Sequence, residues 1–182
     1  SIPGTGLPRI GPHSEYAARG QASTIVALPW MPGVARIVAD GFVAGKPFEA
    51  CPRQVLKRAL LALADRGWSL RVGIEPEFYL LKRDGARLVA ADAQDGLDAA
   101  AYDLKTLPRQ LPFLRDLQDA LERCGVDLTQ IDHEDGQGQF ELNFSPADAL
   151  HAADQLMLVK LAAQAIAERH GMLFSLMPKP FT

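Results

Sequence analysis

The stretch Ser69-Leu-Arg-Val-Gly-Ile-Glu-Pro-Glu-Phe-Tyr-Leu-Leu81 decides the fold. Its apolar side chains at positions 70, 72, 74, 78 and 80 share one parity, which predicts a β-strand with one buried face. Pro76 has no backbone N–H and therefore favours a sheet edge or a bulge. Glu75 and Glu77 are two residues apart and point to the side opposite the apolar residues. Like charges this close repel, so the pair predicts either a bound cation or a solvated strand face.

A second acidic stretch, His133-Glu-Asp-Gly-Gln-Gly-Gln-Phe-Glu141, lies downstream. Polar and apolar residues alternate on both sides of its glycines, over 126–143, which is typical of a β-hairpin. The hairpin would bring Glu134 and Glu141 toward each other. Four glutamates on two strand units suit hard cations such as Mg²⁺ or Mn²⁺, which take oxygen ligands. The alternative interpretation is that these glutamates are ordinary surface charges. This interpretation is less favoured because residues expected to be buried flank each cluster.

The rest of the chain alternates between helical and strand patterns. The predicted elements are helices over 52–64, 108–124 and about 145–170, a hairpin from 23–28 and 35–39, a polar surface loop over 92–103, and a short strand over 173–177. Ser145 is the expected cap of the last helix, and Gly171 its expected end. Together these elements predict an α+β fold, with an antiparallel sheet and helices packed on one face.

Composition and motifs exclude several classes of function. The net charge is -3 and no apolar run reaches 18 residues, so we expect neither a nucleic-acid partner nor a membrane span. Cys51 and Cys124 form no disulfide or zinc pattern, which favours a reducing cytoplasm. There is no P-loop and no nucleophile elbow. The glycines at 136 and 138 lie in a hairpin, which is the wrong context for a dinucleotide-binding motif.

Several motifs resemble those of glutamine synthetases. Gly73-Ile-Glu-Pro-Glu-Phe78 resembles the strand that opens their catalytic domain, and Asp132-His-Glu134 with Gly138-Gln-Phe-Glu141 resembles their second metal-ligand hairpin. The other matching motifs are Leu28-Pro-Trp30, Asp40-Gly41, Cys51-Pro-Arg53 with Lys57, and Met177-Pro-Lys-Pro180. The amino-acid sequence of the hairpin is similar to that of the type III-like subgroup and its γ-glutamylmethylamide synthetase relatives. The resemblance implies that residues 1–45 are the tail of an N-terminal β-grasp-like domain and 46–182 the N-terminal part of the catalytic domain.

The resemblance also implies a set of site residues. The implied metal ligands are Glu75, Glu77, Glu134 and Glu141, and the implied cofactor-binding residues are Gly73 and His133. Glu75 corresponds to a ligand of the ion that bridges the ATP phosphates. The other three glutamates correspond to ligands of the ion nearer the amino-acid substrate. No catalytic residue is assigned.

In that family, ATP phosphorylates the side-chain carboxylate of glutamate, and ammonia or a small alkylamine then displaces phosphate to form an amide. The resemblance therefore implies an ATP- and metal-dependent ligase of nitrogen metabolism that is a homo-oligomer at full length. The family's later site residues would lie beyond Thr182, so we expect a segment of a longer protein that is inactive alone. The alternatives are a catalytically silent structural or regulatory relative, and a plain metal- or nucleotide-binding module.

Overall fold

The computed structural model describes residues 16–180, which divide into two compact units. Among these residues, the first unit contains 16–27 and 35–70, and the second contains 28–34 and 71–180. No helix in the described part of the chain is both long and apolar enough to cross a membrane.

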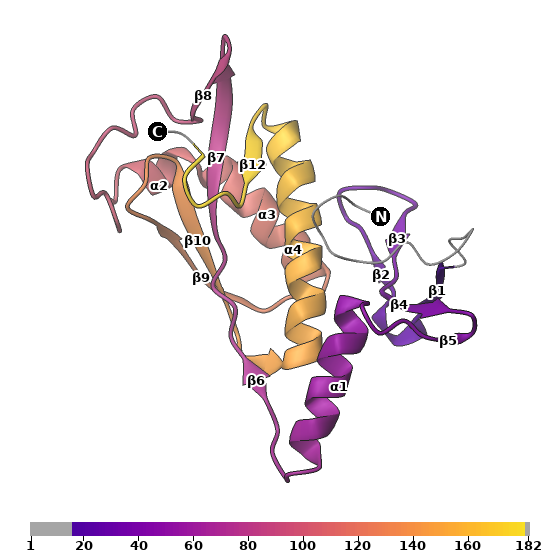
Figure 1. Cartoon of the computed structure of the whole chain (residues 1–182). Coiled ribbons are helices and arrows are strands. Elements are labelled where there is room, and N and C mark those ends of the chain that lie inside the picture. The colour runs from indigo at the N-terminus through magenta and orange to yellow at the C-terminus, as the bar shows by residue number, and fades with distance from the viewer. Residues whose placement is uncertain (1–15, 181–182) are drawn as a thin grey trace. The chain divides into compact units, whose positions relative to one another are not determined.

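The first unit consists of short strands and one helix (Figure 1). Its three-stranded antiparallel sheet has the order β1 (Tyr16–Gly20), β4 (Ala39–Val43), β5 (Lys46–Pro47), while β2 (Val26–Ala27) pairs with β3 (Ala35–Arg36) after the 3-10 turn η1 (Ala22–Thr24). The β2–β3 pair confirms the predicted hairpin, with shorter strands.

Helix α1 (Pro52–Ala64) has the predicted bounds. Helical spacing predicts one apolar face made of Val55, Leu56, Ala59, Leu60 and Leu63. That face is not buried, because Gln54 is the helix's only buried residue and Val55 is 46% exposed. Ion pairs attach its first turns to β4 instead: Arg53 and Lys57 contact the carboxylate of Asp40 at 2.7 and 2.5 Å.

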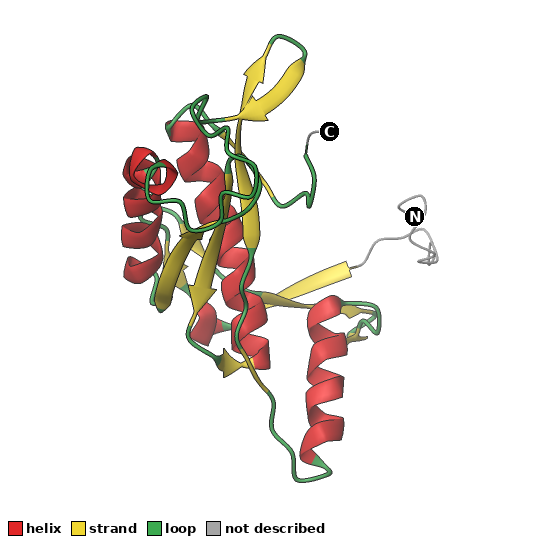
Figure 2. Ribbon diagram, turned by 90° about the vertical axis from the view of Figure 1, so that its left-hand side faces the viewer, coloured by secondary structure: helices red, strands yellow, loops and turns green. Residues whose placement is uncertain are grey.

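The second unit is built on a five-stranded antiparallel sheet. The strand order is β12 (Leu173–Ser175), β7 (Glu77–Asp84), β10 (Gln139–Phe144), β9 (Leu128–His133), and β8 (Arg87–Ala90) pairs with the far end of β7. Figure 2 shows β7 and β8 projecting as a hairpin past the rest of this sheet. A separate ribbon joins β6 (Arg71–Val72) to β11 (Ala147–Asp148).

The strand predicted over 69–81 is therefore interrupted. Residues 73–76 belong to no strand, and the sheet begins at Glu77, directly after Pro76. Pro76 thus lies just outside the ladder, rather than on the expected edge strand or in the expected bulge, and its missing N–H costs no ladder hydrogen bond there. In β7 both sides are buried: Tyr79 and Leu81 are enclosed as well as the predicted Phe78 and Leu80.

Three helices belong to the second unit: α2 (Thr106–Arg109), α3 (Leu111–Arg123) and α4 (Ala149–Arg169). Helix α3 contacts α4 and β9, and α4 contacts β12, so the two long helices pack against the sheet. The core between them includes Phe78, Phe113, Phe140, Leu117, Leu121 and Leu142. This confirms the predicted α+β class with an antiparallel sheet.

Two local predictions were wrong. Ser145 does not cap the last helix: α4 begins at Ala149, because residues 147–148 pair with β6 as a strand. The segment 92–103 is not simply a surface loop, since Asp95 and Ala100 are buried. The end of α4 is as predicted, with Gly171 following it at φ +67°.

Candidate active site

A row of carboxylates crosses three strands of the second unit. Glu141 on β10 lies directly opposite Glu77 on β7 and Asp132 on β9. Residues directly opposite in antiparallel strands have Cβ atoms about 5 Å apart and share one face of the sheet. The neighbouring pair Phe78 and Phe140 points to the other face, where the two rings stack in the core. The apolar face thus fixes the register that places the acidic row on the opposite face.

Glu134 joins this row from the end of β9. Its backbone N–H donates to the carbonyl of Gln139 at 2.9 Å, which closes the hairpin between β9 and β10. Burial raises the pKa of Glu134 above its usual range, and the charges of Glu141 and Glu77 raise it further. Glu134 is therefore a partly buried carboxylate with two further carboxylates close enough to affect its ionisation. The structure therefore brings together three of the four predicted metal ligands.

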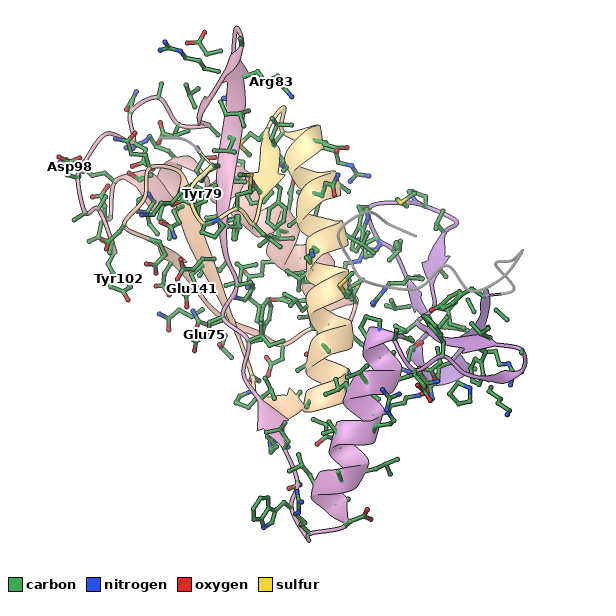
Figure 3. All side chains as sticks on the ribbon, in the orientation of Figure 1. Glu75, Tyr79, Arg83, Asp98, Tyr102 and Glu141 are labelled. Atoms are coloured by element: carbon green, nitrogen blue, oxygen red, sulfur yellow. The ribbon has the colours of Figure 1, made fainter. Side chains whose placement is uncertain are left out.

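Glu75 lies just before the strand, in the interrupted segment 73–76, and is exposed. This segment continues along β10, because the N–H of Leu142 donates to the carbonyl of Pro76 at 3.2 Å. Figure 3 shows Glu75 and Glu141 on the same side of the sheet. The fourth predicted ligand thus lies next to the row, on an extended segment outside the ladder.

The chemistry of this cluster fits a hard divalent cation, since its donors are carboxylate oxygens with uncompensated charge. Among residues 16–180, no salt bridge involves Glu77, Glu134 or Glu141. The side chains are not yet closed into a cage: within the same residues, no group of three His, Cys, Asp or Glu side chains is arranged to hold a metal ion. The donors fit, and their carboxylates would have to converge on a bound ion.

One amide contacts the cluster directly. The side chain of Gln139 donates to Glu77 Oε2 at 2.5 Å and accepts hydrogen bonds from the N–H of Gly136 at 2.8 Å and from the hydroxyl of Tyr79 at 3.0 Å. This role of Gln139 is not predicted by any pattern in the sequence. A polar residue that alternates with core residues on a strand carries no signal that distinguishes an interacting amide from a solvated one.

His133 lies on the core side of the sheet. Its side chain is 0% exposed, with Nε2 2.9 Å from Asp95 Oδ2 and Nδ1 3.2 Å from the carbonyl of Ala100. The same Asp95 oxygen accepts from the N–H of Gly138 at 2.5 Å. The predicted nucleotide contact of this ring stays a prediction, and it would require the ring to leave both partners. In the structure, His133 and Asp95 connect the 92–103 loop to the acidic hairpin.

Gly73 is exposed, as a nucleotide contact would require. A methyl group added there would meet nothing nearer than Pro146 Cγ at 3.8 Å, so space within the described chain does not demand glycine. The predicted cofactor role of this residue also stays a prediction.

Comparisons with known proteins show which family the chain resembles. The family description "Glutamine synthetase, catalytic domain" matches residues 49–182. A glutamate–methylamine ligase of Methyloversatilis universalis is 45% identical over 169 residues, covering 93% of this chain and 38% of that protein. A glutamine synthetase of Rhizobium meliloti is 36% identical with the same coverage. The chain thus spans about 38% of the length of these relatives.

Solved structures show the same relationship. The structure titled "GmaS/ADP complex" superposes with a TM-score of 0.86 at 36% identity, covering 91% of this chain and 38% of that one. A glutamine synthase homolog at 21% identity has a TM-score of 0.69, which shows the shared fold alone. Since the family description covers most of the chain, the chain belongs to the glutamine synthetase family.

Proposed function

We propose that this chain supplies the acidic, cation-binding part of an ATP-dependent carboxylate–amine ligase. The complete reaction joins glutamate to ammonia or a small alkylamine. The γ-carboxylate of glutamate takes the terminal phosphoryl group of ATP, releasing ADP, and the amine then attacks the acyl carbon of γ-glutamyl phosphate, releasing phosphate and a proton. The similarity to a glutamate–methylamine ligase favours a small alkylamine as one substrate to test.

In this proposal Glu77, Glu134 and Glu141 hold one divalent cation, and Glu75 contributes to a second. Bound Mg²⁺ or Mn²⁺ would neutralise phosphate charge and orient the phosphoryl group for in-line transfer. The sheet fixes the backbone positions of Glu77 and Glu141 before any ligand arrives, because core residues anchor the other face of both strands. Such positioning and charge stabilisation account for most of the catalysis in phosphoryl transfer.

The proposed domain organisation of the chain follows from the same family relationship. We infer that residues 46–182 are the first part of the catalytic domain, that residues 1–45 belong to a preceding domain, and that these 182 residues alone do not form amides. The extent of the relatives supports this inference, since more than half of their length lies outside the match.

The observation that carries the proposal is the strand register, which sets Glu141 opposite Glu77 and closes the hairpin with Glu134 at the end of β9. Carboxylates held together without a compensating base repel one another when charged, and a bound cation removes that repulsion.

Calorimetric titration of this chain with Mn²⁺ tests the proposal. Glu134→Gln and Glu77→Gln should each weaken Mn²⁺ binding by roughly tenfold or more, because each removes one anionic ligand. Glu122→Gln on the exposed surface of α3 is the matched control and should leave binding unchanged. Equal affinity in the parent and in both site variants would reject the metal site. Turnover by this chain with ATP, glutamate and methylamine would reject the inference that it is inactive alone.

A further inference from the structure

The side-chain amide of Gln139 connects three parts of the candidate site: the hairpin turn at Gly136, the buried ring of Tyr79 on β7, and the carboxylate of Glu77. Gln139 lies opposite Tyr79 in the β10–β7 ladder, so its side chain reaches these groups from a fixed backbone position.

Its contacts fix which way the amide points. The N–H of Gly136 can only donate, so the group that faces it must be the amide oxygen. The hydroxyl of Tyr79 reaches the same oxygen. The amide nitrogen is therefore the end that faces Glu77, where it donates to Oε2. An amide whose oxygen accepts two hydrogen bonds is polarised and becomes a stronger donor.

Glycine at position 136 allows the amide of Gln139 and the hydroxyl of Tyr79 to approach the hairpin turn closely. A Cβ at Gly136 would lie 2.5 Å from the amide oxygen of Gln139 and 2.5 Å from the hydroxyl of Tyr79. Distances this short force one group to shift, so a larger residue at 136 would displace the amide of Gln139 or the hydroxyl of Tyr79 from this contact. Glycine at 136 leaves room for the contact, and its φ is not positive.

From this geometry we propose that Gln139 is a positioning residue for Glu77. Its amide holds one carboxylate oxygen and leaves the other, Oε1, to face the cation. Within residues 16–180, the side chain of Glu77 forms no other hydrogen bond. Without the amide, Glu77 would sample other rotamers and turn away from the charges of Glu134 and Glu141, which repel it. The inference rests on the proposed metal site and adds the residue that orients one of its ligands.

Mn²⁺ titration of Gln139→Met tests the proposal. Methionine keeps the length and volume of the side chain but has no amide, so the Mn²⁺ dissociation constant should rise roughly 10- to 100-fold, as for other residues that orient a metal ligand. The urea midpoint of unfolding should change little, because Gln139 is only half-buried. Gln118→Met on α3, which also removes an amide that contacts a glutamate, is the matched control and should leave Mn²⁺ affinity unchanged.

A double-mutant cycle separates positioning from a general structural effect. In a Glu77→Gln background, Gln139→Met should weaken Mn²⁺ binding no further, since the carboxylate it orients is gone. Gln139→Asn keeps the polar group but cannot reach Glu77, and it should behave like Gln139→Met. Parent-like affinity in both Gln139 variants, with Glu77→Gln impaired, would overturn the positioning role and leave the metal site standing. Parent-like affinity in Glu77→Gln and Glu134→Gln would overturn the proposed function itself.

Discussion

Replacing Asp95 with alanine should destabilise the second unit by about 3–5 kcal/mol. The carboxylate is fully buried and accepts from Gly138 N–H while contacting the ring of His133. Its removal leaves two buried polar groups without partners, each worth about 1–3 kcal/mol, and opens a small cavity. Asp95→Asn should be milder, at about 1–2 kcal/mol, because one oxygen can still accept. Urea unfolding followed by circular dichroism measures the free energy of unfolding of each variant.

Asp98 provides the control for this prediction. It lies in the same loop, is exposed (Figure 3), and should tolerate alanine within about 0.5 kcal/mol. A double-mutant cycle of Asp95→Ala with His133→Leu should give a coupling energy of about 1–3 kcal/mol, since the two side chains share one hydrogen-bond network. If Asp95→Ala were no more destabilising than Asp98→Ala, the buried network would not support the hairpin and the reasoning would fail.

Three further changes test other parts of the structure. Asp40→Asn should lower the free energy of unfolding by about 2 kcal/mol at neutral pH. Burial alone would raise the pKa of the Asp40 carboxyl, but Lys57 and Arg53 outweigh it and hold this pKa below its usual range. The difference in free energy of unfolding between parent and variant should therefore shrink as the pH falls from the usual range of an aspartate pKa to below the lowered value, as measured by urea titration. Leu142→Ala should destabilise by about 2–5 kcal/mol because the side chain is 0% exposed, whereas Leu104→Ala, at 88% exposure, should have little effect on the thermal midpoint. Gly138→Ala should lower the free energy of unfolding by more than about 1 kcal/mol, because the backbone has φ +72° there and the new Cβ would lie 2.7 Å from a carbonyl of β7. Gly85→Ala is the control: it also has a positive φ, but its Cβ would meet no atom within 4 Å. The difference between the two variants therefore measures the effect of the clash.

The sequence predicted elements well wherever a periodic pattern was decisive. Helix α1 was predicted with its bounds, and the β9–β10 hairpin followed from alternation around its glycines. Parity was less informative for β7, where Tyr79 and Leu81 are buried on the side assigned to solvent. Alternation identifies one buried face of a strand, but it cannot show that a distant segment covers the other face. Here the carbonyl of Pro178 lies 3.4 Å from the hydroxyl of Tyr79.

The proposed role of the acidic residues was predictable because carboxylates two positions apart on a strand repel one another, which points to a bound cation. The residues that support them were not. Asp95 binds a ring 38 positions later in the chain and Gln139 binds a carboxylate 62 positions earlier. Contacts over such separations depend on strand order, which a pattern of polar residues does not contain. His133 depends on such contacts too: its ring lies in the core beside Asp95 and the carbonyl of Ala100, and the nucleotide contact implied by the family resemblance stays a prediction.

Helix α1 has a consequence for the order in which the chain opens. Helix α4 buries eight residues, whereas α1 buries one and is held by polar links near its first turn. A thirteen-residue helix is marginal by itself in water, so the later turns of α1 should fray many times before the sheet of the other unit opens. Amide protons near Leu61 would then exchange with deuterated solvent early, and those near Ala162 only with cooperative unfolding. Proteases that act on opened backbone would cleave first in the same place.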